Sequence, residues 1–72
     1  MKIRLNGDPF ELAGPLTIAA LLAQLDIEPR RAAVEHNLDI IKRVRYETTT
    51  IKDGDTVEIV NFVGGGAAEP VR

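Results

Sequence analysis

Three consecutive glycines, Gly64, Gly65 and Gly66, directly follow an apolar run that ends at Val63, and they are the stretch best suited to chemistry. A backbone without Cβ atoms reaches almost any φ/ψ combination and fits slots that are too narrow for a side chain. A strand that ends in such a thread can present its own main chain to the active site of another protein. The alternative is a glycine-rich segment that frays, as chain ends commonly do.

Side chains elsewhere offer little catalytic chemistry. His36 is the only histidine, and one imidazole among scattered carboxylates makes neither a Ser/His/Asp set nor a metal site. We interpret it as a turn residue, and Asp53 and Asp55 as turn formers around Gly54. Residues 64–66 lack the lysine and hydroxyl of a phosphate loop. We therefore predict that the chain is not an enzyme and has no catalytic residue, no metal site and no bound cofactor.

A basic cluster is the one candidate nucleic-acid surface. It consists of Lys42, Arg43 and Arg45, with Arg30 and Arg31 as further candidates. Tyr46 is its lone aromatic neighbour, whereas binding of single-stranded nucleic acid usually needs several aromatic side chains for stacking. Nine basic against eleven acidic residues give a net charge of −2, which argues against a broad grip on phosphates. The cluster is more typical of a solvated face or a docking patch for an acidic partner, and no nucleic acid is expected as a partner.

Composition limits the chain to one small domain. Its 72 residues are too few for a second core, and 44% hydrophobic residues are too many for a disordered chain. No cysteine is present, which excludes disulfides, a thiol nucleophile and thiolate metal sites. Residues 1–5 alternate between polar and apolar from the start, without the apolar segment of a secretory signal. We expect a cytoplasmic protein with no membrane partner.

Two strands and a helix are predicted in the first half. Residues 2–6 and 10–12 alternate as strands do, and Asn6-Gly7 between them is the strongest short hairpin signal. Ile18, Leu21, Leu22 and Leu25 then recur with helical spacing, Thr17 is placed to cap the first turn, and the region before Pro29 ends a helix of about ten residues.

The second half contains further strands. Residues 32–35 and 40–41 are predicted strands joined by a turn at 36–39, and residues 53–55 form another turn. Residues 42–50 have no clear pattern, although Val44 and Tyr46 are candidates for contact with the core. The strongly β-branched stretch 56–63 is predicted as the last strand.

This order of elements predicts an α+β fold of the β-grasp, ubiquitin-like kind. A mixed four- to five-stranded sheet is covered on one face by a single helix, with the first and last strands parallel at its centre. Residues 1–63 form the domain and residues 64–72 a flexible glycine-rich tail. The predicted inward side chains are Ile3, Leu5, Leu12, Ile18, Leu21, Leu22, Leu25, Val34, Val57 and Ile59.

Val60 and Phe62 alternate with this inward set and therefore point to the uncovered face of the sheet. An exposed apolar pair beside the glycine thread often marks a protein contact. Their alternative role is to cover the far side of a small sheet. Because one helix cannot cover two faces, we favour docking of a partner at Val60, Phe62 and the adjoining Val63.

Over residues 1–66 the chain resembles the ThiS-type sulfur carrier proteins of thiamine biosynthesis. The ending is the most specific part of this resemblance, and the other stretches fit many β-grasp domains. The matching stretches are Ile3-Arg4-Leu5-Asn6-Gly7, Thr17-Ile18 to Leu21-Leu22, Val34-Glu35-His36-Asn37 with Ile40-Ile41, Arg45-Tyr46, Asp53-Gly54-Asp55 and Val57-Glu58-Ile59-Val60-Asn61-Phe62-Val63-Gly64-Gly65-Gly66.

The resemblance implies that the carboxylate of Gly66 is the working group, with Gly65 and Gly64 as the thread. An E1-like adenylating enzyme would join it to AMP from ATP. A persulfide from a cysteine desulfurase or sulfurtransferase would convert the product into a thiocarboxylate. Thiazole synthase would receive the sulfur. This chemistry needs no cysteine and no bound cofactor in the carrier.

One departure from the family pattern is that six further residues, 67–72, follow Gly66 and hold its carboxyl group in a peptide bond. Their removal by a processing peptidase would free Gly66, and a tail added during cloning is the other reading. The need to remove these residues favours a sulfur carrier for cysteine synthesis among the alternatives. The alternatives are therefore a carrier for molybdopterin or cysteine synthesis, a ubiquitin-like protein modifier and, more remotely, a β-grasp RNA-binding module.

Overall fold

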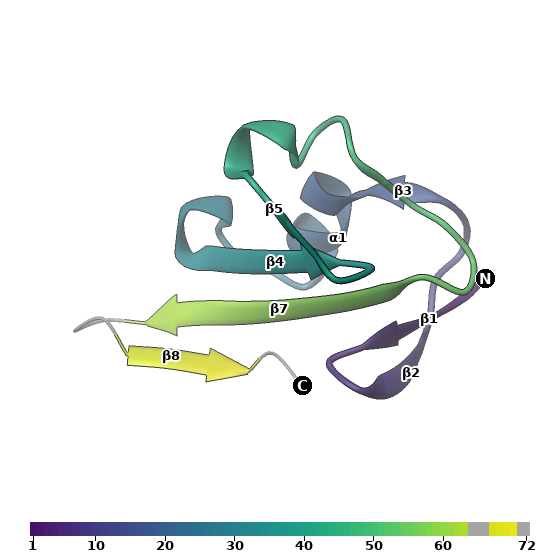
Figure 1. Cartoon of the computed structure of the whole chain (residues 1–72), viewed down its shortest axis with the longest axis horizontal. Coiled ribbons are helices and arrows are strands. Elements are labelled where there is room, and N and C mark those ends of the chain that lie inside the picture. Colours follow the sequence, from purple (N-terminus) through teal and green to yellow (C-terminus); the bar gives the residue numbers. More distant parts are fainter. Residues whose placement is uncertain (64–66, 71–72) are drawn as a thin grey trace.

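The structure, a computed structural model, describes residues 1–63 and 67–70. Along the chain it contains eight strands, one α-helix and two single-turn 3-10 helices, η1 and η2, within these residues (Figure 1). Their bounds are β1 Lys2–Leu5, β2 Asp8–Glu11, β3 Leu16–Thr17, α1 Ile18–Gln24, η1 Pro29–Arg31, β4 Ala32–His36, β5 Asp39–Ile41, η2 Arg43–Arg45, β6 Thr50–Ile51, β7 Thr56–Val63 and β8 Ala67–Pro70.

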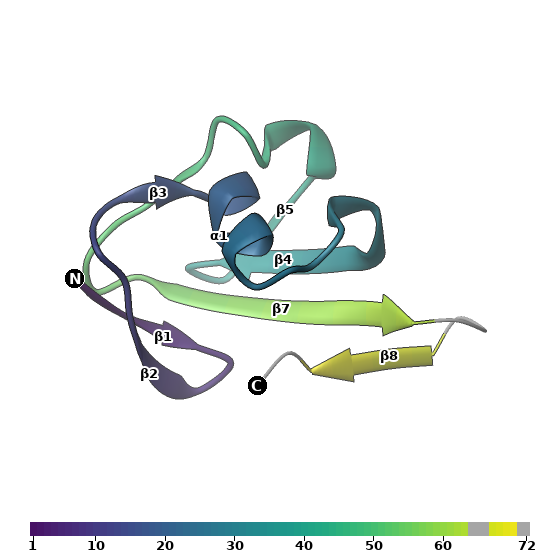
Figure 2. The same cartoon turned by 180° about the vertical axis from the view of Figure 1, so that it is seen from behind.

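The main sheet has the strand order β2-β1-β7-β4-β5, and β8 also pairs with β7. Strands β1 and β7 are parallel, whereas the other pairs are antiparallel. Helix α1 lies against one face of this sheet, as the two opposite views show (Figures 1 and 2). The predicted mixed β-grasp sheet, with β1 beside β7 at its centre and a single helix on one face, is confirmed.

Two tight turns set the register of the sheet. Asn6 and Gly7 have φ values of 50° and 87°, which lets β2 fold straight back on β1. Asn37 and Leu38, at 51° and 74°, do the same between β4 and β5. Both turns lie within the predicted ones, but the second is limited to Asn37 and Leu38. The prediction of His36 as a turn residue is wrong, because it is the last residue of β4 and pairs with Asp39 of β5.

Helix α1 is shorter than predicted. Its start is confirmed, because the Thr17 hydroxyl accepts from the Ala20 amide at 3.1 Å. It ends at Gln24, since Asp26 takes up a left-handed conformation with φ 60° and the Ile27 amide donates to the Leu22 carbonyl at 2.8 Å. This hydrogen bond is characteristic of a Schellman motif. The motif ends the helix several residues before Pro29 and directs the side chain of Ile27 into the core.

The core lies between α1 and the sheet. Nine of the ten predicted inward side chains are buried, and Leu25, after the helix end, is partly buried. Tyr46 is buried, which confirms its predicted contact with the core, whereas Ile27 and Ile51 complete the core and were not predicted there. The proposed core contact of Val44 is wrong: it is 84% exposed, because η2 turns it outward, whereas Tyr46 points inward and donates to the Ala32 carbonyl.

Within the described ranges, 1–63 and 67–70, no helix combines the length and apolar character that a bilayer crossing requires.

Candidate functional site

Strand β7 carries the chain from the core to the glycine thread. Val57 and Ile59 are fully buried and fix its first half. Its pairing with β4 ends at Ala32 and Asn61, so Phe62 and Val63 extend past β4 toward the side of the molecule away from the β1–β2 hairpin (Figure 1). Gly64, Gly65 and Gly66, the predicted sulfur-carrying terminus and thread, lie outside the described residues.

Asn6 occupies the free edge of β7 just past the end of β1. Its side-chain amide donates to the Ile59 carbonyl at 3.0 Å, and its side-chain oxygen accepts from the Ile59 amide at 2.7 Å. Its own backbone amide donates to the Val57 carbonyl at 2.9 Å. Because both polar groups of Ile59 are bonded, the side chain replaces the strand residue that would otherwise pair there.

Strand β8 continues along the same edge of β7, beyond Asn6. Asn61 lies opposite Glu69, Val63 opposite Ala67, and Val60 opposite Pro70. Since the polar groups of Ile59 face this edge, those of Asn61 and Val63 do so as well, because alternate residues of a strand point the same way. Pro70 lies opposite Val60, and the polar groups of Val60 face β4 rather than β8. The lack of an N–H group in Pro70 therefore removes no hydrogen bond to β7.

The sequence predicted no strand after Val63. The prediction that residues 64–72 form a flexible tail is left open, because residues 64–66 and 71–72 lie outside the described residues.

The sheet face turned away from α1 holds an open apolar groove of about 290 Å³. Its lining comes from β4, β5 and β7, and consists of Ala33, Val34, Glu35, Ile40, Glu58 and Val60. Val60 is half-buried there, Ile40 is 78% exposed, and Phe62 farther along β7 is 41% exposed. The predicted docking residues Val60 and Phe62 therefore present apolar surface along the second half of β7. The side chain of Val63, the third of them, lies outside the described residues, and partner docking at all three is still a prediction.

His36 and Asp55 form a structural pair at the other end of β7. The His36 Nε2 lies 2.7 Å from Asp55 Oδ2, and both side chains are largely buried. Asp55 Oδ2 also accepts from the Lys52 amide at 2.9 Å, and Asp53 Oδ1 accepts from the Lys2 amide at 2.8 Å. The two aspartates hold the turn before β7, as predicted. Within residues 1–63 and 67–70, no group of three potential metal ligands is found.

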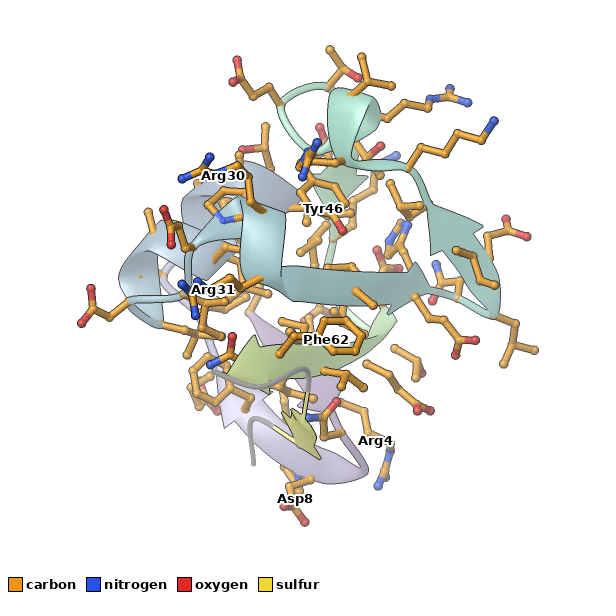
Figure 3. All side chains as sticks on the ribbon, turned by 90° about the vertical axis from the view of Figure 1, so that its left-hand side faces the viewer. Arg4, Asp8, Arg30, Arg31, Tyr46 and Phe62 are labelled. Atoms are coloured by element: carbon orange, nitrogen blue, oxygen red, sulfur yellow. The ribbon has the colours of Figure 1, made fainter. Side chains whose placement is uncertain are left out.

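Two residues of the predicted basic cluster, Arg30 and Arg31, have an acidic partner. Both pair with Glu28, at 3.2 and 3.3 Å, and in Figure 3 they lie on the other side of Phe62 from Arg4. Tyr46 is 3% exposed, so its ring is covered by the core and is not available for stacking on a base.

Two features of this region have no clear sequence signal. The side chain of Asn6 was predicted only as part of a turn, and its bonds to Ile59 depend on how far β1 runs along β7. Glu35 and Glu58 stand directly opposite each other in the β4–β7 register. Strand alternation places both on the outer face, but only the register shows that they meet.

Comparison with known proteins identifies the relatives of this chain. A family model described as the ThiS family matches residues 3–66. A thiazole synthase of Paramagnetospirillum magneticum is 40% identical over 67 residues, which are 93% of this chain and 21% of that protein. This chain spans about a fifth of the length of that thiazole synthase and of a second one from Magnetococcus marinus.

Smaller relatives match over most of their own length. The sulfur carrier protein ThiS of Bacillus subtilis is 46% identical over 50 residues, which cover 69% of this chain and 76% of that protein. The crystal structure of the thiamine biosynthesis protein ThiS from Geobacter metallireducens superimposes with a TM-score of 0.79 at 36% identity, covering 92% of this chain and all of the other.

Proposed function

The chain belongs to the ThiS family, and on this premise we propose that it is a sulfur carrier of thiamine biosynthesis whose working group is the carboxylate of Gly66. The family match ends at this residue, which is the observation that most directly supports the assignment. The small relatives that carry the name sulfur carrier protein support the pathway.

The proposed chemistry converts a poor electrophile into a good one. The Gly66 carboxylate attacks ATP, pyrophosphate leaves, and an acyl-adenylate forms on an E1-like adenylating enzyme. The terminal sulfur of a persulfide, supplied by a cysteine desulfurase or sulfurtransferase, attacks the acyl carbon and displaces AMP. A thiol then reduces the resulting S–S bond, which leaves a thiocarboxylate on Gly66.

The residues of the carrier itself anchor the last strand and give the thread access to the active site of the enzyme. Val57 and Ile59 are buried and anchor the strand that precedes the thread, and in the sequence three residues without side chains follow Val63 up to the reacting carbon. Backbone of this kind enters a narrow active site, where holding the carboxylate in place accounts for much of the rate gain. Residues 67–72 must first be removed, because an amide carbonyl at Gly66 has no carboxylate oxygen to adenylate.

Thiazole synthase is the proposed recipient of the sulfur. Two proteins with that name contain a segment similar to this chain within a longer polypeptide. Such a fusion keeps a carrier and its acceptor at high effective concentration, which is consistent with a functional partnership between the two.

The experiment uses a chain that ends at Gly66, mixed with the adenylating enzyme encoded by the same genome and with ATP. We expect pyrophosphate release that depends on this chain. After addition of a persulfide donor and a thiol, intact-protein mass spectrometry should show the replacement of one oxygen by sulfur. The chain that still carries residues 67–72 is the matched control and should release no pyrophosphate.

Failure of the chain ending at Gly66 to be adenylated contradicts the proposal. Mass spectrometry of the protein isolated from its host gives an independent check, because conjugates between Gly66 and lysine side chains would instead indicate a protein modifier.

A further inference from the structure

Two carboxylates face each other on the outer side of the sheet. Glu35 in β4 pairs in register with Glu58 in β7, and their neighbours Val34 and Ile59 are buried on the opposite side. Side chains in directly opposed positions have Cβ atoms roughly 4.5 to 5.5 Å apart, and like charges placed so destabilise a sheet. This arrangement therefore costs the free protein stability.

No cation among the described residues forms an ion pair with either glutamate. Among residues 1–63 and 67–70, neither Glu35 nor Glu58 takes part in an ion pair. Arg4, an exposed basic residue on the neighbouring strand β1, donates from its guanidinium to the Gly7 carbonyl at 2.7 Å instead.

The surroundings of the two carboxylates are apolar. Both line the groove together with Ala33, Ile40 and Val60, and Ile40 lies opposite Glu35 in β5. In the isolated chain, the exposure of Ile40 to water and the repulsion between the two carboxylates are both unfavourable. A partner that places one positive charge between the carboxylates and apolar side chains around it would remove both effects.

We propose that this outer face docks the adenylating enzyme through an arginine of that enzyme, held between Glu35 and Glu58 and framed by apolar side chains packed on Ile40 and Val60. A planar guanidinium offers a rigid fork of donors to carboxylates and an apolar face to hydrocarbon, which an ammonium group does not. The inference rests on the function proposed above, and it adds the two residues that select the partner by charge.

The test measures binding of the chain ending at Gly66, whose buried core lies within residues 3–59, to the adenylating enzyme from the same genome. Calorimetry without ATP gives the dissociation constant, and pyrophosphate release gives KM and kcat. The test variant is Glu35→Gln with Glu58→Gln. The control is Asp8→Asn with Glu47→Gln, which removes the same charge from two exposed positions outside the groove.

We expect the test variant to raise the dissociation constant by roughly 10- to 100-fold, because a desolvated arginine would lose both charged acceptors. KM should rise with kcat unchanged, since the lost contact is the same in ground and transition states. The control should change the dissociation constant by less than about twofold, as exposed charges outside an interface do. The thermal midpoint of the test variant should stay equal or rise, because the repulsion is gone.

Equal binding by the wild type and the test variant, with normal adenylation of both, overturns this inference and leaves the proposed function intact. Weaker binding together with a lower thermal midpoint also overturns it, because the two glutamates then act on folding. A wild-type chain that neither binds the enzyme nor becomes adenylated overturns the inference and the proposed function together.

Discussion

Asp55 connects three segments that are far apart in the sequence. Its carboxylate accepts from His36 at the end of β4 and from the Lys52 amide, and its backbone carbonyl accepts from the Arg4 amide in β1. Burial raises the pKa of this carboxyl group, but the hydrogen bonds from His36, Lys52 and Asn37 outweigh burial, and the pKa lies below its ordinary value of 3.8. The charged form is therefore the one that the fold stabilises.

The pH dependence of stability follows from that direction. Because the pKa of Asp55 is lower in the folded than in the unfolded protein, its contribution is complete above pH 3.8 and is lost as the pH falls through the folded pKa. We expect Asp55→Asn to lower the free energy of unfolding at neutral pH by about 1 to 3 kcal/mol and to flatten its decline in acid. Urea unfolding across a pH series measures both.

The matched control for this series is Asp39→Asn, at an exposed position of β5. It should leave the acid slope unchanged. An acid slope in Asp55→Asn as steep as that of the wild type would contradict the assignment.

Strand β7 lies at the centre of the sheet and leads into the candidate site. Three partners bond to the edge of β7 that faces β1. Strand β1 pairs with its start, Asn6 bonds Ile59, and β8 pairs from Val60 to Val63. Pairing with β4 protects the opposite edge as far as Asn61. Each amide of β7 thus has an identifiable acceptor on one side, except that of Phe62, which faces the β4 edge beyond the last paired residue.

Removal of residues 67–72 should change the protection of particular amides. The N–H groups of Asn61 and Val63 face β8, so their hydrogen exchange should become about 10-fold faster or more when β8 is absent, since exchange follows local opening. The Ile59 amide, bonded to Asn6, and the Val60 amide, facing β4, should keep their rates and serve as internal controls. Amide-resolved NMR exchange on the two chain lengths makes the comparison, and uniform acceleration along β7 would contradict it.

An element could be predicted from the sequence where the residues that determine it lie close together in the chain. Alternation and Asn-Gly chemistry predicted β1, β2 and β7, because the relevant signals lie within a few residues. The early end of α1 was missed, since a left-handed Asp26 is uncommon and Pro29 offered a stronger stop signal. The roles of Asn6, Glu35 and Glu58 depend on register between distant strands, which a single sequence does not encode locally.

At the scale of the whole molecule, the loop between β5 and β7 closes the core. Tyr46 and Ile51 are 3% and 0% exposed, and the Tyr46 hydroxyl donates to the Ala32 carbonyl at 3.1 Å. Burial raises the pKa of Tyr46, although the charge of Arg43 acts in the opposite direction. Residues 42–50, which have no clear sequence pattern, therefore cover one side of the hydrophobic core through Tyr46.

Two neighbouring substitutions separate this role from general loop effects. Tyr46→Ala should lower the free energy of unfolding by about 3 to 5 kcal/mol, because it empties a buried aromatic site. Val44→Ala, two residues away and exposed, should change it by less than about 0.5 kcal/mol. Urea denaturation measures both, and Tyr46→Phe, with an expected loss of about 1 kcal/mol, isolates the hydroxyl bond. Equal effects at positions 44 and 46 would contradict the described core.

The pairing of Ala67 with Val63 has a consequence for maturation of the proposed carrier. Proteases cut segments that are extended and accessible on both edges, whereas here the residue just past the cleavage point belongs to a strand in a sheet. Detachment of the last strand must then precede cleavage, so the supply of active carrier would be limited by how often that strand opens, and strengthening it would slow maturation without touching any reacting group.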